Sequence, residues 1–150
     1  MITRFERFSL AIFEISRCWH KLAAKELMKL GLKGSHARYL TAMYKYPQGI
    51  TVPQLCTVCG KDKSDASRTL SALEAKGLVT KQRVGGSLYR GVMLLTDKGR
   101  RASELITERA SRVVAAAGRG ITDEEREVFY RVLDSVTVNL RKLCKEGIPD

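Results

Sequence analysis

The chain carries a long, narrow apolar stripe near each end, and these stripes restrict its fold more than any other feature. In residues 2–30, apolar side chains recur every three or four positions, which predicts one long helix that stops at Gly31. The stripe consists of Ile2, Phe5, Phe8, Ile12, Ile15, Trp19 and Leu22. A domain of this size does not offer enough surface of its own to cover so long a helix. We therefore expect this helix to pack on a second copy of the chain.

The last helix is predicted to have the same character. Thr122-Asp-Glu-Glu125 is a capping-box sequence, in which the threonine and the last glutamate satisfy free N–H groups at a helix start. The apolar positions that follow are Phe129, Val132, Val136, Leu140 and Leu143. We expect residues 1–34 and 119–150 to form dimerisation helices around a central core, residues 35–100, within a single domain of 150 residues.

The central residues favour short helices and a hairpin, separated by glycines. Gly60 and Gly77 break helical patterns, and Gly85-Gly86-Ser87 supplies a tight turn between two β-compatible runs. The predicted elements are helices at 35–46, 53–59, 63–76 and 97–117, strands at 78–84 and 88–95, and an extended stretch at 50–51. The predicted N-caps are Ser35, Asp62 and Thr96. This order predicts a mainly α fold with a small antiparallel β-wing.

The chain is strongly basic, with a formal net charge of +11 and a pI near 9.8. Residues 61–101 hold ten Lys or Arg against four Asp or Glu, a local net charge of +6. A surplus of this kind suits a polyanionic partner. No apolar run approaches the roughly 18 residues of a membrane span, and the first residues lack the apolar stretch of a signal peptide. We therefore expect a cytoplasmic protein, and the charge by itself leaves DNA, RNA and an anionic membrane surface open as the partner.

The order short helix, glycine turn, helix, hairpin is the layout of a winged helix-turn-helix. A helix that enters the major groove of B-DNA needs an apolar inner face and a short polar or basic outer face. The outer face of helix 63–76 carries Lys63, Ser64, Ser67, Arg68 and Ser71. Arg68 has the bidentate fork that matches guanine O6 and N7, whereas Lys61 and Lys63 at the helix start suit phosphates. A solvated helix face is the alternative interpretation of these side chains.

The predicted hairpin is a second basic element. Lys81, Arg83 and Arg90 place three cations on a two-stranded ribbon, and Ser87 lies at its tip. A slim basic ribbon suits the minor groove, where negative potential is concentrated over A·T-rich DNA. These four residues complete the set of DNA-binding candidates.

With these residues in this order, the sequence resembles the MarR family of winged helix-turn-helix transcriptional regulators. The matching segments are Ile50-Thr-Val-Pro-Gln-Leu-Cys56, Asp62-Lys-Ser-Asp-Ala-Ser-Arg-Thr-Leu70, Leu73-Glu-Ala-Lys-Gly-Leu-Val79 and Leu95-Thr-Asp-Lys-Gly99. The resemblance implies a homodimer with intertwined terminal helices, a recognition helix at 63–76 and a wing at 80–93. The family's wings often carry an Asp-Arg-Arg-like run, and this chain departs from that pattern with Gly86-Ser-Leu-Tyr-Arg90, one residue out of register.

The predicted function is therefore that of a homodimeric regulator that binds double-stranded DNA, not a membrane, at a pseudo-palindromic operator. We expect a repressor that is released by a small ligand or an oxidant. One alternative is a nucleoid or replication-associated DNA-binding protein, and another is a winged-helix protein-interaction module. No nucleophile–base–acid set, phosphate loop or carboxylate pair stands out in the sequence. We accordingly predict no enzyme activity, no catalytic residues and no cofactor.

Three aromatic or imidazole side chains are candidates for an effector pocket. Trp19, His36 and Tyr39 are expected near the junction of the first two helices, where MarR-like proteins often bind small aromatic molecules. Packing in the core is the alternative role for all three.

The four cysteines are predicted to be reduced and unbridged, as is usual in a cytoplasmic chain. Cys18 is a candidate redox sensor, because one branch of the MarR family senses peroxide through a cysteine near its N-terminal helices. Packing beside the apolar stripe, next to Trp19, is the alternative role. Cys56 and Cys59 are predicted to pack rather than to bind metal. A zinc site needs about four ligands, and no second Cys or His pair is near in the sequence.

Overall fold

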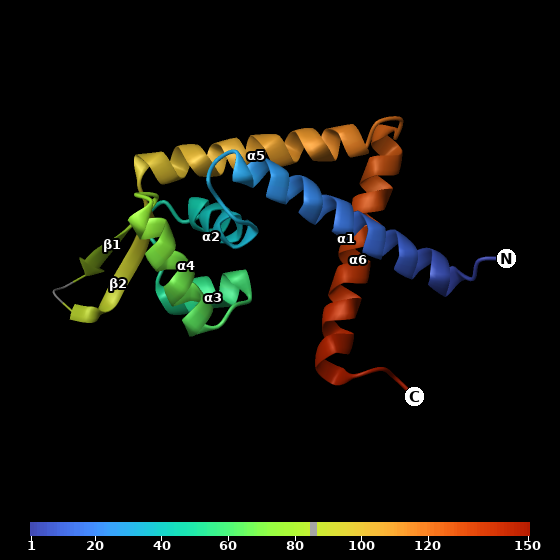
Figure 1. Cartoon of the computed structure of the whole chain (residues 1–150). Helices are drawn as coiled ribbons and strands as arrows, with labels where there is room; N and C mark the ends of the chain where they lie inside the picture. The colour runs from blue at the N-terminus through green and yellow to red at the C-terminus, as the bar shows by residue number, and fades with distance from the viewer. Residues whose placement is uncertain (85–86) are drawn as a thin grey trace. The chain divides into compact units, whose positions relative to one another are not determined.

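The structure is a computed structural model that describes the backbone of residues 1–84 and 87–150 and the side chains outside 84–90. Within these residues it has six helices and one two-stranded antiparallel sheet (Figure 1). They are α1 (Arg4–Met28), α2 (Gly34–Tyr44), α3 (Val52–Cys59), α4 (Lys63–Ala75), β1 (Val79–Val84), β2 (Ser87–Leu95), α5 (Asp97–Ala117) and α6 (Asp123–Glu146). The predicted mainly α fold with a β-wing is confirmed. The chain divides into two compact units, Met1–Ser111 and Arg112–Asp150.

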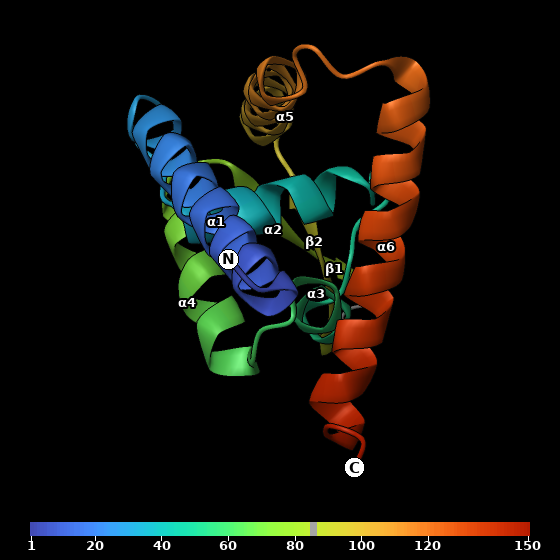
Figure 2. The same ribbon diagram turned by 90° about the vertical axis from the view of Figure 1, so that its right-hand side faces the viewer.

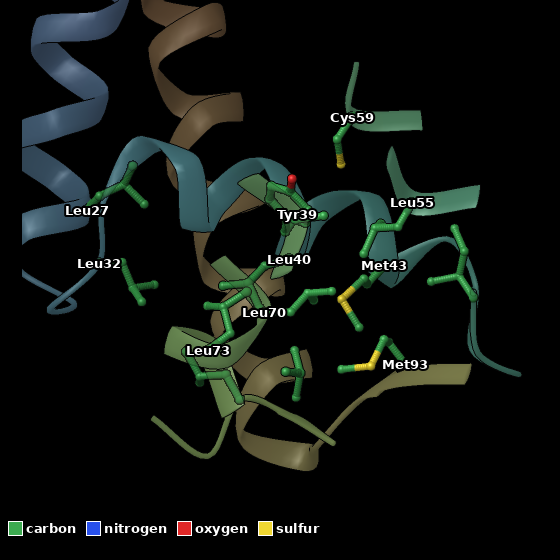
Figure 3. Packing of buried hydrophobic residues seen from close by; sticks show 14 residues of the cluster. Leu27, Leu32, Tyr39, Leu40, Met43, Leu55, Cys59, Leu70, Leu73 and Met93 are labelled. Atoms are coloured by element: carbon green, nitrogen blue, oxygen red, sulfur yellow. The ribbon is translucent and has the colours of Figure 1, made fainter. Parts of the chain in front are cut away.

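Helix α2 is the central element of the first unit. It contacts α1, α3, α4 and β2, and both views show α3 below it and α4 beside it (Figures 1 and 2). Tyr39, Leu40 and Met43 on its lower face are buried against Leu55 of α3 and Leu73 of α4 (Figure 3). Burying a large apolar side chain contributes about 1.5–3 kcal/mol, so each member of this cluster stabilises the unit.

The end of α4 and the start of α5 meet at a very close backbone contact. Gly77, with φ +72°, ends α4, and the Thr96 N–H donates to the Leu78 carbonyl at 3.1 Å. A Cβ added to Gly99 would lie 1.9 Å from that same carbonyl oxygen. Only glycine therefore fits at this position. One turn later, the buried Ser103 hydroxyl donates to the Leu40 carbonyl at 3.1 Å and ties α5 to α2.

The predicted helix caps are confirmed with one exception. Asp62, Thr96 and Thr122 each accept a hydrogen bond from the backbone three residues on. Ser35 is not the cap of α2, because Lys33 holds the N-cap position and Gly34 is already helical. There the Lys33 N–H donates to the His36 Nδ1 at 3.1 Å. The imidazole thus takes the place that the glutamate side chain occupies in an ordinary capping box.

Several element boundaries also differ from the prediction by one or two residues. Helix α1 ends at Met28 instead of residue 30, because Gly31 turns left-handed and the Leu32 N–H bonds back to the Leu27 carbonyl. The extended stretch at 50–51 is confined to Ile50, which forms an isolated antiparallel bridge with Met93. Its neighbour Thr51 serves as the N-cap of α3.

The wing is a hairpin with an irregular end. Val79 pairs with Leu95, and regular antiparallel pairing continues to Arg83 opposite Gly91. The next pair is Val84 with Ser87, so three residues of β2 lie between two successive pairs. The predicted turn glycines, Gly85 and Gly86, lie outside the described residues.

Candidate nucleic-acid interface

Helix α3 and the turn after it are built from local signals. Its capping box joins the Gln54 N–H to the Thr51 Oγ1 at 3.3 Å and the Thr51 N–H to the Gln54 Oε1 at 3.1 Å. Pro53 lies in the first turn, where its missing N–H removes no helical hydrogen bond. Gly60 then adopts φ +64°, which reverses the chain after Cys59 and aims it toward the next helix.

Helix α4 separates its side chains into two faces. The buried positions are Ala66, Thr69, Leu70 and Leu73. The exposed positions are Lys63, Ser64, Ser67, Arg68 and Ser71, and Lys61 just before the helix is exposed as well. These are the outer-face residues expected from the sequence. The three serine side chains among them are short, which lets the helix backbone approach base edges closely.

Arg68 is positioned to act on a partner outside the chain. It projects from the exposed face, one turn into α4, and it has no hydrogen bond or ion pair with the described part of the chain. An arginine in this state keeps all five of its N–H donors available. The start of α4 adds the partial positive charge of its free N–H groups, which favours phosphate.

Strand β1 extends the basic surface. Lys81 and Arg83 are exposed, and as alternate residues of one strand they lie on the same face of the hairpin. The stem of Lys81 lies over Gly91 on β2, where an added Cβ would be 2.7 Å from the lysine Cε. Ser87 and Arg90 belong to the β2 backbone, and their side chains lie outside the described residues. Sequence and structure thus place two wing cations on a common face.

The three effector candidates occupy different environments. Tyr39 is fully buried in the core and His36 is buried as a helix cap, whereas Trp19 on α1 is 41% exposed. Burial lowers the pKa of His36, and the charges of Lys76 and Lys33 lower it further. The core positions of Tyr39 and His36 correspond to the alternative role stated for them above.

The cysteines divide by burial. Cys59 is buried, and burial raises the pKa of its thiol; Cys56 is half-buried against the same core. Cys18 is partly exposed, and its Sγ lies 3.5 Å from the Glu14 Oε1. The described residues contain no group of three or more Cys, His, Asp or Glu side chains arranged to hold a metal ion.

Two hydrogen bonds at this site were not anticipated from the sequence. The Tyr39 hydroxyl donates to the Asp65 Oδ2 at 2.8 Å, and the Arg38 Nη1 donates to the Cys59 carbonyl at 3.4 Å. They join α2 to both sides of the α3–α4 turn. The two residues joined by each bond are 26 and 21 positions apart in the sequence, so no local spacing pattern predicts these bonds. A buried tyrosine needs a partner for its hydroxyl, which is the one signal that pointed to such a bond.

A third unanticipated contact holds the other end of α4. The Lys98 Nζ donates to the carbonyl of Lys76, the C-cap of that helix, at 2.9 Å. A cation is favourable at a helix C-terminus because it meets the negative end of the helix dipole. The helix is therefore fixed at both ends by residues distant in sequence.

Comparison with known proteins matches this arrangement to one family. Residues 30–87, from the end of α1 into the wing, match the sequence model of the MarR family. A MarR family transcriptional regulator from Listeria monocytogenes was solved in complex with a 26-mer DNA. Its sequence is 25% identical to this one and its structure superposes with a TM-score of 0.77, over 93% of this chain and 95% of that chain.

Among the described residues, no helix combines the length and apolarity needed to cross a bilayer.

Two further solved structures extend the likeness over nearly the whole chain. A MarR protein from Peptoclostridium difficile is 23% identical with a TM-score of 0.80, over 95% of this chain and 94% of that chain. MepR, a transcription regulator of the Staphylococcus aureus multidrug efflux pump MepA, is 20% identical with a TM-score of 0.73, over 89% of this chain and 98% of that chain. The MarR family's sequence pattern is thus matched by the central residues 30–87, and solved structures with the same fold cover nearly the whole chain.

Proposed function

We propose that the protein is a transcriptional regulator that binds double-stranded DNA as a homodimer and reads a pseudo-palindromic operator. The observation that carries this proposal is the outer face of α4. Arg68 is exposed there without a partner in the described chain, among short serines and beside the basic strand β1. The similar regulator from Listeria monocytogenes was solved with DNA, which supports the same partner here. A DNA-binding regulator of this kind acts in the cytoplasm and catalyses no reaction.

The dimer is supported by apolar surface that a single copy leaves uncovered. On α1, Phe5, Phe13 and Ile15 are 75%, 69% and 62% exposed, and on α6 Val138 is 60% exposed. Monomeric proteins rarely expose such continuous apolar stripes. We assign residues 1–34 and 119–150 to dimerisation and 35–100 to the DNA-binding core. Two-fold symmetry then presents two copies of α4 to half-sites about 34–36 Å apart, which is why the operator is expected to be pseudo-palindromic.

We propose that the bound dimer represses transcription and that release acts through α1. Cys18 and Trp19 both lie on this helix, which we assign to dimerisation, so an oxidant or an aromatic ligand that acts there changes the interface that sets the spacing of the two copies of α4. Peroxide treatment should weaken DNA binding by the wild type and leave a Cys18→Ser variant unaffected. Equal loss in both proteins would remove Cys18 as the sensor.

The test of the proposed function is selection from a pool of random DNA duplexes, followed by binding measurements on recovered and random DNA. We expect a strong preference for recovered duplexes that contain an inverted repeat. Equal binding to both would indicate a nucleoid or replication-associated protein. No binding to either would indicate a protein-interaction module. Light scattering on the same sample should give the mass of two chains of 16.8 kDa.

A further inference from the structure

The hydrogen bond between Tyr39 and Asp65 links the core to the first turn of α4. The Tyr39 ring is fully buried beside Leu40 and Leu70, with its hydroxyl at the edge of the cluster on the side of Cys59 (Figure 3). From there it donates to the Asp65 Oδ2 at 2.8 Å. Burial, and then the bond to Asp65, raises the pKa of Tyr39 well above its usual range. The hydroxyl therefore stays protonated and remains a donor at any physiological pH.

The neighbouring residue on α2 holds the other side of the same turn. The Arg38 guanidinium donates to the carbonyl of Cys59, the last residue of α3, at 3.4 Å. A cation at this position also meets the negative end of the α3 dipole. Two adjacent residues of α2 thus contact the end of one helix and the start of the next, across a turn that contains Gly60.

Apolar packing fixes which face of α4 is buried, but it tolerates small rotations of the helix about its axis. The buried face of α4 uses small or flexible side chains, such as Ala66 and Leu70, and hydrophobic contact is non-directional. A hydrogen bond to a carboxylate is directional and is stronger than a neutral one. Asp65 lies three residues before Arg68, at a neighbouring position on the helix surface, so a bond that holds the half-buried Asp65 at the edge of the buried face also fixes the direction in which Arg68 points outward.

We propose that Tyr39 is a positioning residue for sequence reading: its bond to Asp65 sets the rotation of α4 and thereby aims Arg68 at the bases. This inference rests on the proposed function, because it presupposes that α4 reads DNA. Tyr39 contacts no DNA in this arrangement and acts only through Asp65. The same link also keeps the Asp65 carboxylate turned away from the phosphates.

Tyr39→Phe is the direct test, since it removes one oxygen and keeps the buried ring. Binding is measured on a duplex recovered by selection with the wild type and on the random pool. We expect the preference for the recovered duplex to fall by about tenfold, as when one base contact is misplaced. Binding to random DNA and its salt dependence should remain unchanged, because phosphate contacts tolerate a small rotation.

The matched control is Tyr44→Phe. Tyr44 is on the same helix, and its hydroxyl donates to the Glu104 Oε1 on α5 at 3.1 Å, away from α4. This variant should keep the full preference. If both tyrosine variants lower the melting temperature while the preference stays intact, Tyr39 has only a structural role and the proposal is overturned.

A second pair of variants separates the hydrogen bond from the charge. Asp65→Asn keeps an oxygen that accepts from Tyr39, whereas Asp65→Ala does not, and both remove the same negative charge. We expect Asn to retain the preference and Ala to lose it to the same extent as Tyr39→Phe. Equal preference in the two Asp65 variants would contradict the proposal. If the wild type itself shows no preference, the proposed function fails instead, so the two failures are distinguishable.

Discussion

Helix α2 and the two terminal helices differ in how their apolar side chains are covered. On α2, Tyr39 and Leu40 are completely buried by segments of the same unit. On α1, which has a single buried residue, Phe5 is 75% exposed, and α6 has no buried residue at all in one copy of the chain. The apolar side chains of the central core are therefore covered by other segments of the same chain. The terminal helices leave their apolar side chains exposed in one copy, and we propose that association with a second copy covers them.

This contrast separates two properties of the protein. The internal geometry of α3, α4 and the wing is set within one chain, through the contacts of α2. The distance between two copies of α4 is set by whatever covers α1 and α6. Variants in the core should consequently lose stability or sequence preference, whereas variants in the terminal helices should lose dimerisation. The following predictions use that difference.

The largest effect is expected from a charge in the terminal stripes. Trp19→Glu and Leu140→Glu place a carboxylate where we expect a partner helix, at side chains 41% and 46% exposed in one copy. Both variants should become monomeric and lose operator affinity by about 100-fold or more, because each half-site then binds alone. Light scattering and binding titrations measure the two effects. Tyr46→Glu, at an equal exposure of 41% but after α2, should remain dimeric. Dimeric Trp19 and Leu140 variants would contradict the assignment.

The next effect concerns the core alone. Gly99→Ala forces a Cβ to within 1.9 Å of the Leu78 carbonyl oxygen, so α5 must move away from the wing. We expect a loss of about 3 kcal/mol in the free energy of unfolding, at the upper end for overpacking. Denaturant titration provides the measurement. Gly34→Ala, whose added Cβ meets nothing within 4 Å, is the control and should not destabilise the protein. Similar stability in both variants would mean that the close approach is not maintained in solution.

A smaller effect distinguishes the two DNA-facing elements of the core. Arg68→Ala should reduce the preference for operator over random DNA by about 1–3 kcal/mol, because it removes a base contact. Arg83→Ala should weaken binding to both DNAs alike and lower the salt slope by about one unit, because it removes a phosphate contact. Titrations of both variants on both DNAs at two salt concentrations decide the matter. An intact preference in Arg68→Ala would show that another element reads the groove.

The smallest effect is a pH dependence from the buried cap of α2. Burial, with Lys76 and Lys33, holds the pKa of His36 below its unfolded value of 6.5. Folding therefore favours the neutral ring, whose contribution to stability is complete above pH 6.5 and is lost as the pH falls below that value. His36→Gln should flatten this part of the stability profile, measured by urea unfolding between pH 5 and pH 8 (about the range in which histidine titrates). His20→Gln, at an exposed site, is the control. Parallel profiles for wild type and His36→Gln would exclude the effect.

The outer face of α4 could be predicted from the sequence because its signals are local. Asp62 and Gly60 fix where the helix begins, and the apolar spacing of Ala66, Leu70 and Leu73 fixes which face is buried. Once those are known, the exposed positions follow from the helical period. The same reasoning predicted the hairpin and the capping box at Thr122.

The roles of Tyr39, His36 and Ser35 could not be obtained in that way. The sequence left both an effector pocket and core packing open for Trp19, His36 and Tyr39, and it predicted a cap at Ser35. The structure buries Tyr39 against a carboxylate 26 residues away and uses His36 in the capping arrangement of α2. A buried aromatic side chain and a pocket-lining one have the same spacing in a sequence. Their difference depends on which distant residue faces them.

The sequence alone therefore determined the order of the elements, the caps at Asp62, Thr96 and Thr122 and the composition of each face, since these depend on residues within about one helical turn of each other. Tertiary structure decided the rest: the close backbone contact between Gly99 and Leu78, the capping of α4 by Lys98, and the hydrogen bond that joins Tyr39 to Asp65. Each of these needs two segments far apart in the chain to meet at a defined distance. That meeting is fixed by packing of the whole core, and no local period of the sequence encodes it.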